Sequence, residues 1–190
     1  MSSKPGRIFV VSAPSGAGKT TLLNRLLADF PDLRRSVSCT TRPPRAGERD
    51  GVDYTFIDEK TFQKMIDENL FFEWEEVHSY RYGTPKAQLI ETRNQGLDTI
   101  LDIDTRGAMT LRKAFSDAVL IFLMPPSIET LEVRLKGRQT EAEEALKRRL
   151  ENARQEMAEK DKFDYIIVND DKERAYQDLR SVIDQVRRHS

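Results

Sequence analysis

The chain has 190 residues, of which 38% are apolar and 33% are charged, a balance typical of a folded domain rather than a disordered chain. Its 31 lysines and arginines nearly balance 32 acids, which argues against a broad basic surface for nucleic acid or a membrane. The lone Cys39 excludes an internal disulfide, no cysteine/histidine cluster indicates zinc, and no apolar run approaches membrane-spanning length, so the cytoplasm is the expected compartment.

Strands and helices alternate along most of the chain. A β-branched and aromatic run at 7–12 predicts a buried strand, and leucines at helical spacing predict a helix over 19–30, which Pro31 ends. Further buried strands are expected at 99–104, 118–124 and 165–168. Further helices are expected near 108–115, from a Ser127 cap to about 136, from a Thr140 capping box to about 160, and over 173–188. Strands separated by helices predict an α/β fold, with a parallel sheet flanked by helices.

The stretch 36–85 breaks this alternation. It carries a Pro/Gly/Arg loop, a strand-like segment near 54–57 and a helix over about 58–69. We therefore expect one domain over 1–190 with an inserted substrate lobe and a polar loop. The predicted parts are a core of 1–35, 86–136 and 145–190, a lobe at 36–85 and a loop at 137–144.

The strongest motif lies between the first strand and the first helix. It nearly matches the phosphate-binding pattern G-x-x-x-x-G-K-[ST], with Ala13 in place of the first glycine. Glycines let backbone N–H groups approach a triphosphate, and the helix N-terminus adds a positive dipole end. Lys19 would neutralise the β- and γ-phosphates, and the Thr20 hydroxyl would ligate Mg²⁺. The predicted ATP-binding residues here are Ala13, Pro14, Ser15, Gly16, Ala17, Gly18, Lys19, Thr20 and Thr21.

A second phosphate site is indicated by two arginines. Arg42 and Arg45 lie three residues apart on a proline-stiffened segment, where their guanidinium forks suit a phosphate. Tyr54 and Tyr82 are candidates to add phenolic hydrogen bonds. A lone arginine would be interpreted as a solvated side chain, but the cluster favours phosphate binding.

Several motifs together resemble the guanylate kinase family, over about residues 8–188. They are the phosphate loop, SCTTRPPRAGE at 38–48, GVDY at 51–54, FEW at 72–74, YGT at 82–84, LDID at 101–104 and VNDD at 168–171. The resemblance implies a P-loop core, a GMP-binding lobe at 36–85 and a mobile lid at 137–144. It also implies a transferase of purine nucleotide metabolism, which moves the γ-phosphoryl group of ATP to GMP or dGMP by in-line transfer in a closed site, with Mg²⁺.

The resemblance assigns ten residues to the GMP site. They are Ser38, Arg42, Arg45, Tyr54, Glu73, Tyr82, Gly83, Thr84, Asp102 and Asp104. The arginines and tyrosines would hold the phosphate, while Ser38, Glu73, Thr84 and Asp104 would bind the guanine. The chemistry of Glu73 agrees, because guanine presents an N1–H and an amine to a carboxylate, whereas adenine presents an acceptor at N1. The alternative is that Glu73 is a surface acid, but its neighbours Phe72 and Trp74 favour a pocket.

Asp102 and Asp104 end an apolar strand, where ligands bind in α/β folds. One of them would hold Mg²⁺ through water, with Asp102 as the candidate. Strand alternation places both on the same face, so the pattern leaves open which serves the metal and which serves guanine.

Positive charge for the transferring phosphoryl group is predicted from the lid and the helix after it. By motif position Arg138 and Arg149 would act in the transition state, which with Lys19 and Arg45 gives the predicted catalytic set. Arg134, Asn169 and Asp170 would contact ATP, the last two at the adenine. The alternative for these arginines is a charged helix face, paired with nearby glutamates.

Three departures from the family pattern have open consequences: Ala13 for glycine, Arg106 for glutamine and Gln139 for glycine. Two other functions remain to be weighed, a kinase of another nucleoside monophosphate and a catalytically silent protein-binding module. Such a module would be expected to lose phosphate-loop or lid residues, which this chain retains. The expected ligands are ATP and GMP or dGMP, with no nucleic acid and no membrane. Protein partners and oligomeric state are left open.

Overall fold

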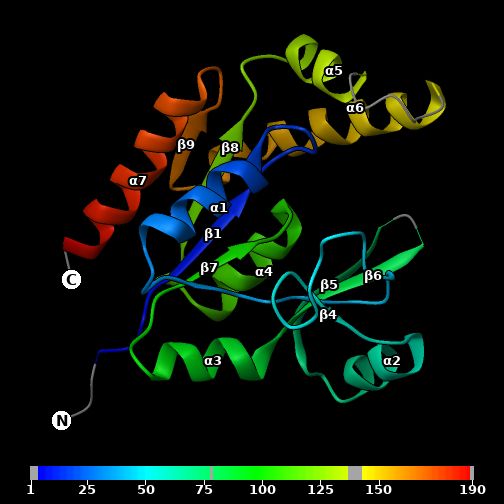
Figure 1. Cartoon of the computed structure of the whole chain (residues 1–190), viewed down its shortest axis with the longest axis vertical. Coiled ribbons are helices and arrows are strands. Elements are labelled where there is room, and N and C mark those ends of the chain that lie inside the picture. The colour runs from blue at the N-terminus through cyan, green and yellow to red at the C-terminus, as the bar shows by residue number, and fades with distance from the viewer. Residues whose placement is uncertain (1–3, 78, 137–142, 189–190) are drawn as a thin grey trace. The chain divides into compact units, whose positions relative to one another are not determined.

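The computed structural model describes residues 4–77, 79–136 and 143–188 (Figure 1). The chain divides into two compact units. The first unit comprises Met1–Phe9 and Asp32–Ala118, and the second comprises Val10–Pro31 and Val119–Ser190. Among the described residues, no helix has the length and apolar character needed to cross a membrane.

The larger sheet has five strands in the order β2-β7-β1-β8-β9. They are β1 (Ile8–Ser12), β2 (Arg34–Arg35), β7 (Thr99–Asp102), β8 (Val119–Met124) and β9 (Tyr165–Val168). β2 pairs with β7 and β8 pairs with β9, both in parallel. All five residues of β1 are buried, as its continuous apolar run predicts. The predicted α/β fold with a parallel sheet flanked by helices is therefore confirmed.

The first unit also contains a four-stranded sheet in the order β4-β3-β6-β5. Its strands are β3 (Cys39–Thr40), β4 (Thr55–Phe56), β5 (Phe71–Val77) and β6 (Tyr80–Pro85), and the last two pair antiparallel. Helix α2 (Glu59–Asp67) is capped by Asp58, whose side chain accepts from the Thr61 N–H. Phe62 of α2 stacks on Phe71 of β5, with ring centroids 4.6 Å apart. This aromatic contact fixes α2 and β5 to one another.

Two further helices complete the first unit. α3 (Lys86–Asn94) packs against β7, and α4 (Thr105–Ala114) packs against β5. α4 begins three residues before the predicted helix because Asp104 caps it, accepting from the Gly107 N–H at 2.7 Å. This cap brings the end of β7 and the start of α4 close to β5.

The second unit contains α1 (Lys19–Asp29), α5 (Ile128–Lys136), α6 (Glu143–Ala158), a 3₁₀ turn at Lys160–Lys162 and α7 (Lys172–Arg188). The predicted Ser127 cap is present, since its Oγ accepts from the Thr130 N–H at 3.2 Å. α5 and α6 pack through a buried cluster of Leu131, Leu135, Leu150 and Ala153. The Thr140 capping box and most of the predicted lid lie outside the described residues.

The prediction that 165–168 forms a buried strand is wrong in its burial. β9 lies at the edge of the sheet, where Ile167 is buried but Ile166 remains 44% exposed. The strand itself forms as predicted, because its β-branched residues suit a pleated surface wherever it lies.

Candidate active site

The phosphate loop of the second unit requires glycine at two positions. Gly16 and Gly18 have φ angles of 89° and 95°, which side chains rarely adopt. A Cβ at Gly18 would also lie 2.4 Å from Asn169 Nδ2, so this position has no room for one. Ala13 is not among the described non-glycine residues with positive φ, which explains why a methyl group replaces the family's first glycine there. The first turn of α1 carries no acidic side chain, so its positive end remains available to an anion.

Asn169 supports this loop from the segment after β9. Its side chain is 2% exposed, and its Nδ2 donates to the Ala17 carbonyl at 2.6 Å. Its own backbone carbonyl accepts from the Arg134 guanidinium at 3.0 Å. The structure thus brings the predicted ATP residues Ala17, Arg134 and Asn169 together, with Asn169 in contact with the loop itself. Asp170 is exposed and pairs with Arg174.

Substitution Asn169→Ala is expected to loosen the phosphate loop. It leaves the Ala17 carbonyl without its amide donor in a buried site, which costs about 1–3 kcal/mol of unfolding free energy. Urea denaturation with and without ATP measures this loss and the accompanying weaker ATP binding. An unchanged ATP affinity would show that Asn169 does not shape the loop.

Arg149 of α6 also reaches the loop. Its guanidinium donates to Ser15 Oγ at 2.6 Å, across 134 residues of sequence. Its neighbour Arg148 is exposed, so adjacent arginines on one helix differ in their surroundings. The structure therefore places Arg149 beside the loop with the predicted Lys19 and Thr20, while Arg138 lies outside the described residues.

In the first unit, Arg42 is held in a fixed orientation. It is 7% exposed, its Nε donates to the Tyr82 hydroxyl at 3.2 Å, and its other nitrogens donate to Glu48 at 2.9 Å and the Pro43 carbonyl at 2.7 Å. The guanidinium also lies 5.5 Å from the centre of the Tyr54 ring. The predicted cluster of Arg42, Tyr54 and Tyr82 is thus assembled.

Glu48 is a residue that sequence reasoning missed. Its second carboxylate oxygen accepts from the Arg45 backbone N–H at 2.7 Å, so one side chain orients Arg42 and closes the turn that carries Arg45. The hydrogen bond from Arg42 lowers the pKa of the Glu48 carboxyl. Arg45 itself is exposed. The glutamate three residues after Arg45 was the available signal.

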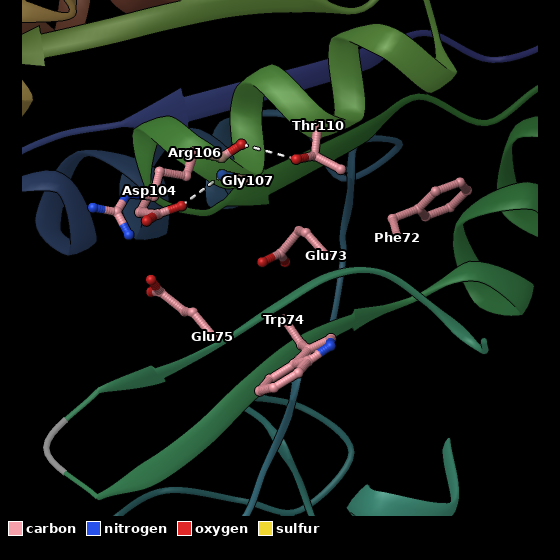
Figure 2. A pocket seen from close by; sticks show the side chains of 8 residues that line it. All are labelled: Phe72, Glu73, Trp74, Glu75, Asp104, Arg106, Gly107 and Thr110. Atoms are coloured by element: carbon pink, nitrogen blue, oxygen red, sulfur yellow. Dashed lines mark hydrogen bonds between the residues drawn. The ribbon is translucent and has the colours of Figure 1, made fainter. Parts of the chain in front are cut away.

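A pocket of about 350 Å³ lies between β5 and the start of α4 (Figure 2). Its lining residues are Phe72, Glu73, Trp74, Glu75, Asp104, Arg106, Gly107 and Thr110. Glu73 accepts from the Thr84 hydroxyl at 2.5 Å, and burial raises the pKa of its carboxyl, with the nearby Asp104 adding to the rise. A Cβ on Gly107 would lie 3.2 Å from Glu73 and 3.1 Å from Asp104, so glycine keeps the two acids close.

The remaining predicted GMP residues lie around this sheet. Gly83 is buried under Phe71, where a Cβ would lie 2.9 Å from the ring. Ser38 is half-buried next to β3, and its carbonyl accepts from the Thr55 N–H at 2.9 Å. Asp102 lies 4.0 Å from Arg35, at the end of β7. All ten predicted GMP residues thus belong to the first unit, and the predicted ATP residues belong to the second.

Glu75 is the second residue that sequence reasoning missed. Alternation along β5 places it on the same face as Glu73, which was the available signal. Burial raises the pKa of the Glu75 carboxyl to about 8, and the charge of Asp104 adds to the rise. Arg106 is the cation that faces this group.

The raised pKa of Glu75 predicts that the free energy of unfolding depends on pH. Its pKa rises from an ordinary 4.5 to about 8 on folding, so between these values the folded state holds a proton that the unfolded state has released. The free energy of unfolding should therefore fall as pH rises through this window. Glu75→Gln should flatten that fall, as measured by urea denaturation at pH 5, 6, 7 and 8. Equal slopes for the two proteins would contradict the shift.

Comparisons with known proteins agree on one family. The family model described as guanylate kinase matches residues 5–186. The chain is 51% identical to the guanylate kinase of Syntrophotalea carbinolica and 49% identical to that of Myxococcus xanthus, covering 94% of this chain each time and 85% and 86% of those proteins. The crystal structure of guanylate kinase from Anaplasma phagocytophilum matches with a TM-score of 0.75 and 32% identity, over 96% of this chain and 87% of that one. The chain therefore belongs to the guanylate kinase family.

Proposed function

We propose that this protein transfers the γ-phosphoryl group of ATP to GMP, giving ADP and GDP. The observation that carries this is the pocket between β5 and α4, where the acceptors Glu73 and Asp104 suit the N–H donors of guanine. Family membership supports the same reaction. Phosphorylation of dGMP is expected to be slower than that of GMP.

The second unit would bind the donor nucleotide. The loop's backbone N–H groups and Lys19 would hold the ATP phosphates at the N-terminus of α1. Arg149, which already bonds Ser15, would reach the group being transferred. Asn169 and Arg134 would keep the loop in shape rather than take part in the chemistry.

The first unit would bind the acceptor. Arg42, Arg45, Tyr54 and Tyr82 would hold the GMP phosphate, with Glu48 keeping Arg42 in place. Glu73, Thr84, Ser38 and Asp104 would bind the base. Adenine would present its N1 acceptor to the Glu73 carboxylate, so AMP would lose a hydrogen bond and gain a repulsion.

Magnesium is part of this proposal. The described residues contain no group of three or more histidine, cysteine, aspartate or glutamate side chains placed to hold a metal. Thr20, exposed in the first turn of α1, would supply a hydroxyl, and Asp102 would act through water. Bound Mg²⁺ would neutralise charge on the phosphate oxygens.

Two broader expectations belong to the same proposal. The division into a core, a GMP-binding lobe at 36–85 and a lid at 137–144 stays a prediction. A cytoplasmic location is expected because the reaction consumes ATP.

Substitution Arg42→Ala tests the acceptor side. Arg42 grips the acceptor phosphate before reaction, so its loss should raise KM for GMP about 10- to 100-fold, the size of one or two charged hydrogen bonds. kcat should change much less. Steady-state kinetics at saturating ATP separates the two constants. A fall in kcat with unchanged KM would show that Arg42 acts in the chemical step rather than in binding GMP.

Label transfer tests the reaction itself. With ATP labelled in its γ-phosphate and unlabelled GMP, the label should appear in the β-phosphate of GDP. Label released only as inorganic phosphate would identify an ATPase and overturn the proposal. A protein that binds both nucleotides without moving the label would be the catalytically silent module.

A further inference from the structure

The face of β5 that forms the pocket wall carries two acids. Glu73 and Glu75 are two residues apart, while Trp74 between them packs its ring against Phe62, 6.4 Å between centroids. Figure 2 shows both carboxyl groups projecting from the strand into the space below Asp104. Residues two apart on a strand are separated by about 6.6 Å, comparable to the width of a purine base.

Glu75 and Asp104 line the same pocket, Glu75 from β5 and Asp104 from the start of α4. The charge of Asp104 raises the pKa of the Glu75 carboxyl and the charge of Arg106 lowers it. Asp104 is itself fixed by the Gly107 N–H at 2.7 Å. The wall of the pocket therefore presents three carboxyl groups to one cavity, an arrangement that suits a ligand with several hydrogen-bond donors.

Guanine brings such donors on one edge. A carboxylate can pair with the N1–H and one hydrogen of the 2-amino group, and Glu73 is the residue placed for this. The second hydrogen of that amino group then requires another acceptor. Glu75, two residues further along the same face of β5, lines the same pocket and is the candidate acceptor.

We propose that Glu75 is a specificity-determining residue, which accepts a hydrogen bond from the 2-amino group of GMP and so favours guanine over hypoxanthine. This inference rests on the proposed function, because it concerns the same pocket. Hypoxanthine keeps N1–H and O6 but lacks the 2-amino group, so IMP separates the contribution of Glu75 from that of Glu73.

The test compares GMP and IMP with variants of the full chain. Glu75→Ala should lower kcat/KM for GMP on the order of 10-fold, as expected for the loss of one hydrogen bond, and should change kcat/KM for IMP less than about twofold. Calorimetric GMP affinity should fall in parallel. The matched control is Glu76→Ala, since Glu76 is exposed, lies on the other face of β5 and is paired in register with Arg81. It should leave both nucleotides unaffected.

Three outcomes would overturn the inference. Equal losses for GMP and IMP would make Glu75 a structural residue, and no loss for either would place it outside the base site. An Arg106→Gln variant that reproduced the Glu75→Ala losses with both nucleotides would mean that Glu75 serves only to hold Arg106. These outcomes differ from a failure of the proposed function, in which the wild-type protein would phosphorylate neither GMP nor IMP.

Discussion

Replacing Arg149 with alanine is expected to lower kcat on the order of 10³-fold, the effect of removing a transition-state arginine. KM for GMP should change little, because in the proposed role the guanidinium would contact charge that develops as the phosphoryl group moves. The structural basis is its hydrogen bond to Ser15, which places the guanidinium at the phosphate loop. Single-turnover kinetics with ATP and GMP measure the chemical step directly.

The neighbouring Arg148 provides the matched control. It lies on the same helix but is exposed, so Arg148→Ala should keep kcat within about twofold, as surface changes usually do. Arg149→Lys is a second control, because lysine retains the charge but loses the planar fork. Full activity of Arg149→Ala would show that this arginine is part of a solvated helix face. Arg138, outside the described residues, is expected to behave like Arg149 in the same assay.

The second large effect is expected from Glu73→Gln. Glutamine keeps the size of the side chain and one acceptor, but it directs an N–H₂ group toward the N–H donors of guanine. The dissociation constant for GMP should rise about 10- to 100-fold, the equivalent of a lost charged hydrogen bond. ATP affinity should not change, since the predicted ATP residues lie in the other unit.

Calorimetry with each nucleotide separates these two effects. Glu76→Gln makes the same chemical change three residues further along β5, on its exposed face, and it should leave GMP affinity unaltered. If Glu73→Gln bound GMP as tightly as the wild type, the buried carboxylate would be an internal structural group bonded to Thr84 and not a base-binding one.

The local features of the fold were predictable because they depend on neighbours in sequence. The run at 7–12 and the glycines of the phosphate loop indicate a strand followed by a phosphate-binding turn without any tertiary information. The same holds for the Ser127 cap, which depends on a hydroxyl three residues before an N–H. α3 was not predicted, because few of its residues are buried and its apolar pattern is weak.

The features that were missed depend on tertiary contacts. β5 carries three glutamates among its seven residues, and only its pairing with β6 and contact with α4 make it a strand with a buried acidic face. The same contacts place the Glu75 side chain in the wall of the pocket. β9 was predicted to be buried because Ile and Val have the same pattern at an edge as at the centre of a sheet. Asp104 was predicted to bind guanine, and this stays a prediction. Its role as the cap of α4 could not be predicted, because it depends on where the fold places the Gly107 N–H.

The most direct test of guanine recognition is ADP release from ATP with GMP, AMP, CMP and UMP, each measured at the same concentration in a coupled assay. Acceptors in the β5 pocket suit the donors of guanine and repel the N1 acceptor of adenine. We therefore expect rapid ADP release with GMP alone among the four. Turnover of AMP comparable to that of GMP would contradict the assignment of Glu73 and its neighbours to the guanine base.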